Sequence, residues 1–467
     1  MSATDNAQSH IEQELYQKRK KIYPREVHGI FAKLRLLAVA LLLGLYYFLP
    51  WLKWNGRQAI LFDLPERKFY IFDIVIWPQD FFYLTLLLII AAFALFFFTN
   101  LAGRLWCGYA CPQTVWTEVF MWFEQRIVGD RPKQIKMDKA SWSNPEKILR
   151  VGGKHLAWVL FSLWTGFTFV GWFSPIDDLA ARLIDFNLGP WEWFWVLFYS
   201  FATWGNAGFL REQVCLYMCP YARFQGAMFD RDTLIITYDE TRGEPRSRLA
   251  KGKTVDGKGD CIDCAICVQA CPTGIDIREG LQYECIACAA CIDACDDVME
   301  KIGKPKGLVK YSTEHEMAGG KTHMLRPRSL MYGAVFLIFI LAFFYALSTR
   351  LPLELNIVRD RKSLYKETNE GLIANVFNIR LMNMDAAAHE FELSVSSDEF
   401  SKTRLVAEKT RVNLKSGEVD EIPVRVIVNP EEIKSRSAEI FFELKATDES
   451  GLGIKEPARF IGPVLRR

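Results

Sequence analysis

Five apolar stretches constrain the fold of this chain more than any other feature of its sequence. A helix needs about 20 residues to cross the hydrocarbon core of a bilayer, and each stretch has about that length. Half of the 467 residues are hydrophobic and 14% are aromatic, a composition that suits membrane spans. We therefore expect a polytopic α-helical membrane protein with about five spans, at 34–52, 81–99, 155–173, 191–209 and 329–348.

The segments between the spans differ in their content of Lys and Arg. Residues 1–35 carry seven and residues 100–154 carry nine, against four in 53–80 and one in 174–190. Short loops rich in Lys and Arg stay in the cytoplasm, so we expect the N-terminus, 100–154 and 210–328 there, with the C-terminal tail outside. All twelve cysteines then lie on the cytoplasmic side, which agrees with a reducing compartment.

The tail beyond the fifth span has the pattern of short strands. Segments such as "HEFELSVS" and "EIPVRVIV" alternate apolar and polar residues, and turn signals such as "SGE" separate them. About seven such strands in roughly 115 residues favour an immunoglobulin-like sandwich, and a β domain of another topology is the alternative. Residues 239–260 are charged, rich in Gly and poor in apolar residues, as expected for a linker.

Eight of the cysteines fall in two runs of the same spacing. Residues 261–272 have the sequence CIDCAICVQACP and residues 285–296 have CIACAACIDACD, each a C-x2-C-x2-C-x3-C run. In bacterial ferredoxins with two [4Fe–4S] clusters, the fourth cysteine of each run binds the other cluster. The predicted ligands are Cys261, Cys264, Cys267 and Cys295 for one cluster, and Cys271, Cys285, Cys288 and Cys291 for the second. Structural zinc sites, the alternative, have paired C-x2-C knuckles with longer spacers.

The second run departs from the common pattern at one position. Pro272 follows the first run, whereas Asp296 stands where a second proline is often found. The loop turns differently there, or the acidic group lowers the potential of the nearer cluster. The ligands themselves are not put in doubt.

The four remaining cysteines form a second pattern, C-x3-C-P, which occurs in "LWCGYACP" and "VCLYMCP", each just past a predicted span. Proline is well placed as the first residue of a helix, so we expect amphipathic helices to begin at Pro112 and Pro220 and to lie along the membrane surface. The N-terminal charge of these helices should favour the thiolate form of the preceding cysteine. The repeated order of span, hinge, motif and helix indicates a duplication. The candidate site on the cytoplasmic rim consists of Cys107, Cys111, Cys215 and Cys219.

What these four thiolates bind is open from the residues alone. Soft sulfur ligands select Cu(I), zinc or iron–sulfur clusters. A bound copper ion would lie near the ferredoxin runs, and the preference of thiolates for Cu(I) over Cu(II) favours one-electron reduction. The alternatives are a third cluster, a thiol pair that cycles with a disulfide, and four cysteines that act only as small apolar residues.

The histidines give weaker signals. His315 and His323, with Met317 and Met324, lie in "EHEMAGGKTHM" before the fifth span, and His and Met can bind copper, although such residues in a polar loop are more often incidental. His155 opens the third span, where a lone His is usually neither a haem ligand nor a quinone contact. The sequence has no C-x-x-C-H, no phosphate-binding glycine loop and no evident hydrolytic triad. We expect no nucleic-acid partner.

These patterns divide the chain into a membrane part, a cysteine-rich part and a β-rich tail. The predicted segments are a cytoplasmic N-terminal segment (1–33), a membrane domain with four spans and both C-x3-C-P motifs (34–238), a linker (239–260), a ferredoxin domain with a juxtamembrane segment (261–328), the fifth span (329–348) and an immunoglobulin-like domain (352–467).

Together the motifs resemble one known family. The two C-x3-C-P motifs, the stretch "GRQAILFDLPERKFYIFDIVIWPQDFF", the paired ferredoxin runs and the β-rich tail are similar to the cytochrome c oxidase accessory proteins called CcoG, FixG or RdxA. The resemblance covers nearly the whole chain. It implies a cupric reductase that supplies Cu(I) for assembly of cbb3-type cytochrome c oxidase in a bacterial inner membrane, with the immunoglobulin-like domain in the periplasm. The family's two cysteine sets carry over to the cluster cysteines and the C-x3-C-P cysteines given above.

The resemblance also implies the partners. They are the bilayer, oxidase assembly factors or copper transport and chaperone proteins, and an electron donor that the sequence does not identify. Two other functions are compatible with the sequence. One is a quinol dehydrogenase subunit that feeds a respiratory partner, since membrane ferredoxins of that type share the spans and the C-x3-C-P motif. The other is a non-enzymatic assembly scaffold or copper chaperone.

Overall fold

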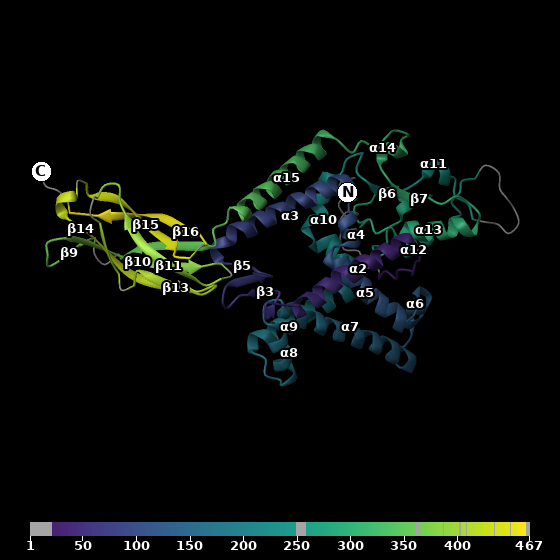
Figure 1. Ribbon diagram of the computed structural model, residues 1–467. Coiled ribbons are helices and arrows are strands. Elements are labelled where there is room, and N and C mark those ends of the chain that lie inside the picture. The colour runs from purple at the N-terminus through teal and green to yellow at the C-terminus, as the bar shows by residue number, and fades with distance from the viewer. Residues whose placement is uncertain are drawn as a thin grey trace, which may run out of the picture. The chain divides into compact units, whose positions relative to one another are not determined.

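The computed structural model describes residues 21–248, 258–360, 364–385, 387–400, 403–407, 409–433, 435–448 and 450–463. The chain forms two compact units, which we describe separately (Figure 1). The helical unit comprises Met1–Phe69 and Pro78–Leu341, as far as these residues are described, and the β unit comprises Tyr70–Trp77 and Ala342–Arg467.

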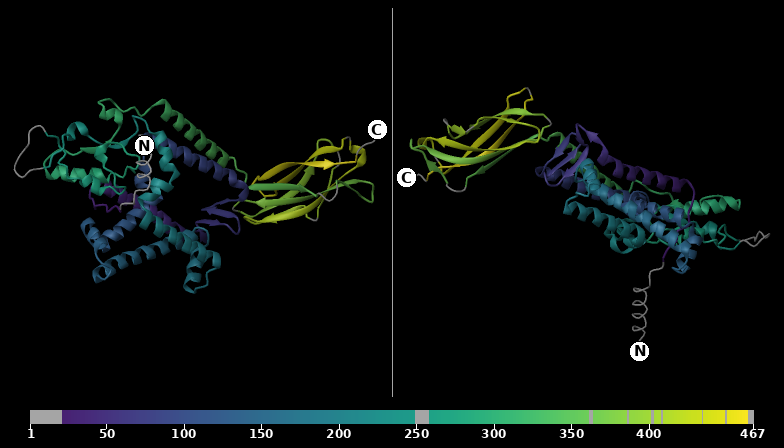
Figure 2. Two further views of the ribbon diagram at one scale, coloured as in Figure 1. Left: turned by 180° about the vertical axis from the view of Figure 1, so that it is seen from behind. Right: turned by 90° about the horizontal axis from the view of Figure 1, so that it is seen from below.

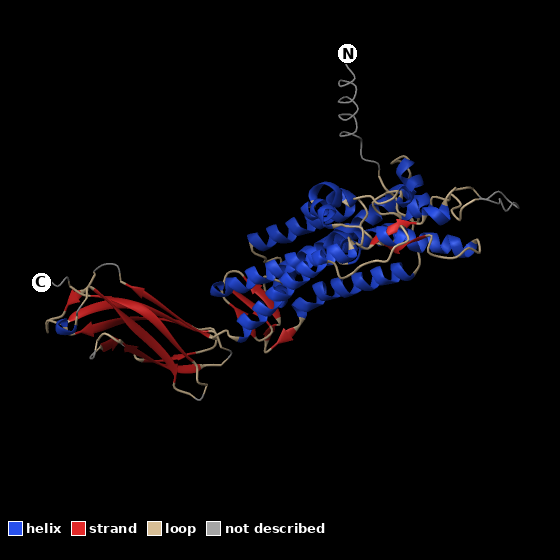
Figure 3. Ribbon diagram, turned by 90° about the horizontal axis from the view of Figure 1, so that it is seen from above, coloured by secondary structure: helices blue, strands red, loops and turns tan. Residues whose placement is uncertain are grey.

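Six helices of more than twelve residues dominate the described part of the chain (Figure 3). They are α2 (Ile30–Phe48), α3 (Phe81–Ala102), α5 (Pro112–Ile127), α7 (Pro145–Gly171), α9 (Pro190–Thr203) and α15 (Pro327–Ser348). The shorter helices are α4 (Leu105–Tyr109), α6 (Arg131–Lys139), α8 (Ile176–Ile184), α10 (Pro220–Gln225), α11 (Glu240–Gly243), α12 (Ile266–Ala270), α13 (Ala290–Lys301) and α14 (Glu314–Met317). Short 3₁₀-helices are η1 (Leu49–Trp51), η2 (Pro78–Asp80), η5 (Gly226–Met228), η6 (Ile277–Glu279) and η7 (Pro430–Glu432), and π-helical turns are η3 (Trp204–Leu210) and η4 (Val214–Met218).

Three helices of the described residues are long and apolar enough to cross a membrane. They are Ile30–Trp51, Phe81–Ala102 and Pro327–Ser348, which correspond to the first, second and fifth predicted spans. The third and fourth predicted spans fall on α7 and α9. The first turns of α7 are polar, so only its second half is apolar. α9 has only 14 residues, about 21 Å, before the π-helical turn η3 begins. The predicted count of five spans is therefore not confirmed.

The long helices alternate in direction. At the start of α2, the amide of Ala32 donates a hydrogen bond to Asp293 of α13 (2.7 Å). Beyond the other end of α2, the side chain of Gln58 donates to the carbonyl oxygen of Gly171, the last residue of α7 (2.8 Å). α2 and α7 therefore both run away from α13, where the second cysteine run lies.

α9 runs antiparallel to α7, and α15 runs antiparallel to α3. The rings of Phe169 and Tyr199 lie 3.7 Å apart between α7 and α9. α3 and α15 lie side by side (Figures 1 and 2), and Asn100 at the end of α3 donates a hydrogen bond to Ser329 at the start of α15 (2.7 Å). One end of the bundle thus contains the last residues of α3 and α9 and the first residues of α2, α7 and α15. This alternation is what successive membrane spans require.

α5 packs inside the bundle. The indole N–H of Trp158 on α7 donates a hydrogen bond to the carbonyl oxygen of Phe120 on α5 (3.0 Å). The side chain of Phe120 is completely buried. One turn further along, Glu124 forms an ion pair with Lys154 (3.3 Å). α5 therefore packs against α7 and α2, and the position of this helix along the membrane surface stays a prediction.

The ferredoxin runs lie between two paired strands. β6 (Ile235–Tyr238) pairs antiparallel with β7 (Val309–Ser312), with Ile235 opposite Ser312. β6 precedes the predicted linker, so the ferredoxin domain includes residues from both sides of it. Short strands also connect α2 to α3, namely β1 (Lys53–Trp54), β2 (Arg57–Gln58), β3 (Ile60–Asp63), β4 (Lys68–Ile71) and β5 (Ile74–Ile76).

The predicted linker 239–260 is partly ordered. It contains α11, and its Arg242 forms an ion pair with Asp260 (2.6 Å). Asp260 also pairs with Lys304 beyond the second cysteine run (2.6 Å). Residues 249–257 lie outside the described residues.

The β unit contains a two-layer sandwich. One sheet has the strand order β12-β14-β10-β8, with β9 paired to β10, and the other has β13-β11-β15-β16. The strands are β8 (Leu353–Arg359), β9 (Lys366–Glu367), β10 (Ile373–Asn383), β11 (His389–Ser396), β12 (Arg404–Ala407), β13 (Arg411–Leu414), β14 (Val419–Val428), β15 (Ser437–Ala446) and β16 (Gly453–Ile461).

The core of this sandwich follows from the alternation seen in the sequence. Every second residue is buried along most of β11 and β15, and the aromatic core includes Phe377, Phe391, Phe442 and Phe460. Side chains of both inner faces fill the space between the sheets, as in immunoglobulin-like sandwiches. The predicted sandwich is confirmed, with nine described strands where the sequence suggested about seven.

Candidate functional site

The two cysteine runs form loops of the same backbone shape. Asp263 and Ala265 in the first loop have φ values of 48° and 54°, and Ala287 and Ala289 at the matching positions of the second have 52° and 59°. Left-handed backbone is unfavourable for residues with a Cβ, so its repetition indicates a shape that both loops require. A helix follows each loop directly, α12 after Ala265 and α13 after Ala289.

Each predicted ligand set lines one cavity. The first cavity is lined by Cys261, Cys264, Cys267 and Cys295, together with mostly apolar side chains and the guanidinium-bearing Arg278. The second is lined by Cys271, Cys285, Cys288 and Cys291, and Cys267 of the first set also lines it. The fourth cysteine of each run thus faces the cavity of the other run, which is the arrangement of a two-cluster ferredoxin.

The chemistry of these cavities fits iron–sulfur clusters. Burial raises the pKa of Cys285 to about 11 and that of Cys288 to about 12. In the first cavity, burial raises the pKa of Cys267 to about 11 and that of Cys295 to about 12. Thiolates in such surroundings need a positive charge beside them, and iron provides it. Four inward-facing sulfurs around each cavity suit one [4Fe–4S] cluster each.

The second cluster loop is fastened to α2. The buried guanidinium of Arg35 donates to the carbonyl oxygen of Cys288 and also pairs with Glu118 of α5 (3.1 Å). The hydroxyl of Tyr311 on β7 donates to the carbonyl oxygen of Ala287 (2.6 Å). The second loop is therefore held rigidly against the helices of the bundle.

The two C-x3-C-P motifs have the predicted local structure. α5 begins at Pro112 and α10 begins at Pro220, and the preceding Cys111 and Cys219 occupy the N-cap position with extended backbone. The helix after the second motif is only six residues long. The prediction that helices begin at the two prolines is confirmed.

The structure packs the two motifs against one another. The side chain of Gln113, just after the first motif, donates to the carbonyl oxygens of Asn206 (3.0 Å) and Arg211 (3.1 Å), which precede the second motif. In the other direction, Gln225 after the second motif donates to the sulfur of Cys107 (3.2 Å). Each half of the predicted duplication therefore holds the other.

The thiols of the two motifs are close enough to influence one another's ionisation. Burial, followed by the charges of Cys111, Cys107 and Cys219, raises the pKa of Cys215 to about 12. Burial also raises the pKa of Cys107, and Cys111 and Cys219 add to the effect. The structure therefore brings the four predicted site cysteines together.

At Cys111 the balance differs from the sequence prediction. The backbone N–H groups of Gln113 and Thr114 at the start of α5 do lower its pKa, as a helix N-terminus should. Burial outweighs them, so the net effect raises the pKa. The predicted effect of the helix N-terminus is therefore present at Cys111, but the partial burial of the thiol outweighs it.

The first motif lies directly against the second cluster loop. Gly108 follows Cys107, and a Cβ at Gly108 would lie 2.7 Å from the carbonyl oxygen of Ile286 and 2.8 Å from the Cα of Cys288. Cys107 itself packs against the apolar group that includes Cys288. Only glycine allows this approach, which joins the four-cysteine site to the ferredoxin domain. The sequence showed this glycine inside the motif but not what it faces.

A buried charge network supports the second motif. Glu124 of α5 binds Arg211 (2.6 Å) and Lys154 of α7 (3.3 Å), and all three residues are buried. Arg211 also donates to the carbonyl oxygen of Gly208 (3.0 Å). Arg211 lies four residues before Cys215, so the network fixes the path of the chain into the second motif. No local sequence signal marks these residues as partners.

The histidines named in the sequence analysis have two different surroundings. The ring of His155 stacks on Phe209 (5.7 Å between centroids) beside Trp158, so it forms part of an aromatic cluster. The ring centroids of His315 and His323 lie 5.4 Å apart, and both rings lie close to the carboxylate of Asp232. Sequence reasoning missed Asp232, which precedes them by more than 80 positions.

Three family models match the sequence. One, described as a 4Fe-4S dicluster domain, matches residues 210–314. A second, described as the IG-like fold at the C-terminal of FixG, matches residues 343–463. The third, described as a 4Fe-4S binding domain, matches residues 84–129, which include Cys107 and Cys111.

Similar proteins are known from three bacteria. Protein RdxB of Cereibacter sphaeroides is 42% identical over 82% of this chain and 83% of its own length, and protein RdxA of the same organism is 39% identical over the same shares. Nitrogen fixation protein FixG of Rhizobium meliloti is 37% identical over 93% of this chain and 91% of its own length. The crystal structure of a FixG-related protein from Vibrio parahaemolyticus is 23% identical, covers 24% of this chain and 95% of that chain, and has a TM-score of 0.21.

Proposed function

Because this chain belongs to the FixG/RdxA/RdxB family of 4Fe–4S proteins, we propose that it is a membrane-bound oxidoreductase that reduces Cu(II) to Cu(I). In this proposal the copper serves the assembly of a cbb3-type cytochrome c oxidase. Its partners are oxidase assembly factors or copper-handling proteins, which the β unit docks on the periplasmic side.

The single observation that carries the proposal is the contact between the two cysteine systems. Gly108 of the first C-x3-C-P motif touches the backbone of Ile286 and Cys288. When bound by the two ferredoxin cysteine sets, [4Fe–4S] clusters supply one-electron storage and transfer. The close approach leaves a short path between Cys288 and Cys107, and a copper ion held by the four site cysteines would lie at the end of that path.

The four site cysteines suit copper as the substrate. Thiolate sulfur is a soft ligand, and it binds Cu(I) in preference to harder ions. The four cysteines are also half-buried, and partial removal from water disfavours the higher charge of Cu(II). Both effects favour the step Cu(II) + e⁻ → Cu(I). The raised pKa of Cys107 and Cys215 means that copper must displace protons from these thiols as it binds.

The proposal places the ferredoxin domain in the cytoplasm. The starts of α2, α7 and α15 lie at the ferredoxin end of the bundle, and the segments at this end carry most of the Lys and Arg of the short loops. The three apolar helices fit a membrane protein. A protease added to sealed inside-out vesicles should therefore cleave exposed segments of the ferredoxin domain and leave the β unit intact.

A third iron–sulfur cluster at the four site cysteines is the second candidate. The observation that favours it is the match of residues 84–129 to a family described as a 4Fe-4S binding domain, although this stretch contains only Cys107 and Cys111. Sulfur ligands of the two motifs together would complete a set of four. Iron analysis separates the candidates, because copper binding predicts about eight iron atoms per chain and a third cluster predicts about twelve.

The test of the proposal is the rate of Cu(II) reduction by anaerobically purified full-length protein supplied with dithionite as electron source. The decisive variant carries serine at Cys107, Cys111, Cys215 and Cys219. His28→Ala, which changes an exposed residue outside both cysteine systems, is the matched control. We expect the serine variant to keep its iron and lose reduction above the background of dithionite alone. Equal rates in the serine variant and the control would refute the role of the four cysteines.

A further inference from the structure

Asp232 lies on a loop that the helices of the bundle hold in place. The loop joins η5 to β6, and the hydroxyl of Thr233 donates to the carbonyl oxygen of Asn100 at the end of α3 (2.9 Å). The neighbouring Asp230 accepts a charged hydrogen bond from Arg326, which also binds the same carbonyl oxygen (2.6 Å). Asp230 is thus engaged by Arg326, whereas Asp232 contacts two histidines.

His315 and His323 reach Asp232 because the chain reverses between them. His315 lies on α14, and Gly319 two residues after that helix has a φ of +83°. Gly320 packs so closely that a Cβ there would lie 2.7 Å from the ring of His315. The two glycines therefore allow the turn that returns His323 to His315. The amide of His323 then donates to a carboxylate oxygen of Asp232 (3.0 Å).

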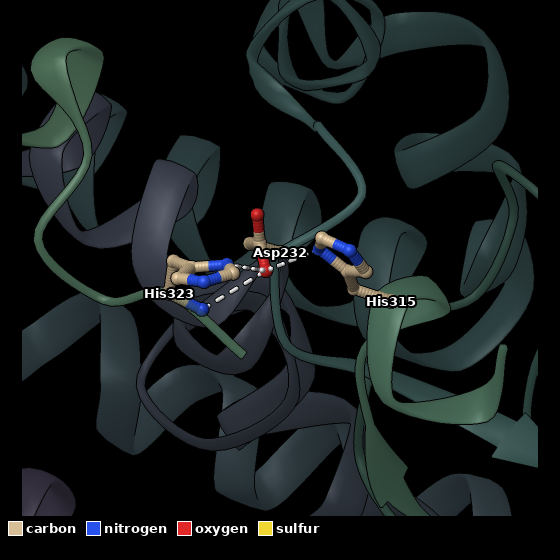
Figure 4. A group of neighbouring side chains, drawn as sticks. All are labelled: Asp232, His315 and His323. Carbon is tan, nitrogen blue, oxygen red and sulfur yellow. Dashed lines mark hydrogen bonds and ion pairs between the residues drawn. The ribbon is translucent and has the colours of Figure 1, made fainter. Parts of the chain in front are cut away.

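The three side chains converge on one point. The Nδ1 atom of His315 lies 3.2 Å from the Oδ1 atom of Asp232, and the Nδ1 atom of His323 lies 3.7 Å from it. One ligand atom from each residue lies within 4.8 Å of the others. Figure 4 shows the rings on either side of the carboxylate, with nitrogen atoms turned toward it. Ligands about 2.1 Å from a tetrahedral ion are about 3.4 Å apart, so two of the three separations already suit a shared ion.

We propose that Asp232, His315 and His323 form a binding site for one divalent transition-metal ion. Two imidazoles and one carboxylate are typical ligands of Cu(II) and Zn(II), and they differ from the sulfur ligands that prefer Cu(I). Among the divalent ions the site should bind Cu(II) most tightly and Zn(II) less tightly, according to the general order of affinities.

The surroundings leave the site accessible. The side chains of His315 and His323 are 42% and 64% exposed, and that of Asp232 is 15% exposed. An ion bound there keeps at least one position open for water, and it can enter from solvent without unfolding the loop. The anchored carboxylate provides a fixed ligand, and the two exposed rings can adjust around the ion.

The proposed site is separate from the four-cysteine site in its ligands and in its preferred oxidation state. Its existence does not depend on copper reduction, since the same ligands bind Zn(II), which has no redox chemistry. Should Cu(II) bind there, the ion would be held in the oxidised state near the end of α3, which leads into the first C-x3-C-P motif.

The test measures binding of Cu(II) and Zn(II) to full-length protein in which serine replaces all four C-x3-C-P cysteines. This background removes competing thiols and separates the outcome from that of the proposed reductase. The variants are the double substitution His315→Ala with His323→Ala, the substitution Asp232→Asn, and His28→Ala as a control at another exposed histidine. Equilibrium dialysis gives affinity, and electron paramagnetic resonance of Cu(II) reports coupling to nitrogen.

We expect one tightly bound Cu(II) per chain with coupling to two nitrogens. The double histidine variant and Asp232→Asn should each weaken binding at least about tenfold, and His28→Ala should not. Zn(II) should raise the unfolding temperature of the background protein but not that of the double variant. Equal affinity in the double variant and the control, or no nitrogen coupling, would overturn the proposal and leave the group as an ion pair only.

Discussion

Replacing Gly108 with alanine tests the contact between the first C-x3-C-P motif and the second cluster loop. The added Cβ would lie 2.7 Å from the carbonyl oxygen of Ile286, 2.8 Å from the Cα of Cys288 and 2.9 Å from the carbonyl oxygen of Ala287. Ordinary contact begins at 3.4 Å, so the motif and the loop must separate by about 0.7 Å, the difference between 3.4 and 2.7 Å. All three atoms belong to the backbone, which cannot swing aside as a flexible side chain can.

Gly152→Ala is the matched control. Gly152 lies in α7, where a Cβ would meet nothing within 4 Å. Both substitutions gain the helical preference of alanine over glycine, about 0.5–1 kcal/mol. Their difference therefore isolates the cost of overpacking, about 1–3 kcal/mol. Thermal unfolding of the two variants in detergent measures it.

The expected result is a lower unfolding temperature for Gly108→Ala than for Gly152→Ala. The alanine variant at 108 should also keep the iron content of the native protein but reduce Cu(II) more slowly, because its motif is further from the loop. Indistinguishable unfolding temperatures and Cu(II) reduction rates in the two variants would refute the close approach.

Two further predictions concern buried charges. Glu124→Gln should destabilise the helical unit by about 3–5 kcal/mol, because it leaves Lys154 and Arg211 buried without their counter-charge. Unfolding in detergent measures the loss of stability. A loss below about 1 kcal/mol would contradict the prediction. In the β unit, the hydrogen bond to Asp448, and then the one to Asp385, raise the pKa of the buried His389 above its ordinary value of 6.5. Protonated His389 therefore stabilises the folded β unit fully below about pH 6.5, and this stabilisation is lost as the pH rises through the higher pKa of the folded state. As the pH rises above 6.5, the unfolding temperature of the β unit should fall more in the native protein than in the His389→Asn variant. Parallel pH profiles for the two proteins would contradict the role of His389.

The parts of the site that depend on local spacing could be predicted from the sequence. The first three cysteines of each ferredoxin run lie within seven residues, so their spacing brings them to one cavity, and the general exchange of the fourth cysteine between two such runs completes each set. The helix starts at Pro112 and Pro220 also follow from local geometry, since proline lacks the N–H that a first helical residue does not need.

The parts that depend on distant partners could not be predicted. Phe120 is completely buried because Trp158 of α7 covers it, and nothing in the sequence around Phe120 distinguishes a face against protein from a face against lipid. The sequence likewise did not show the partial burial that raises the pKa of Cys111. Asp232 escaped notice because its two histidines lie more than 80 residues away.

The central claim is that electrons held by the ferredoxin domain reach copper at the four C-x3-C-P cysteines. A single-turnover experiment tests it most directly: reduced protein, freed of excess dithionite, is mixed anaerobically with one equivalent of Cu(II). Cu(I) is followed with a chelator, and the oxidation state of the iron–sulfur clusters is followed by visible absorbance. We predict one Cu(I) per electron lost from the clusters, and no rapid Cu(I) formation when serine replaces Cys107, Cys111, Cys215 and Cys219. Cu(I) formation at the same rate in that variant, with its iron content unchanged, would contradict the claim.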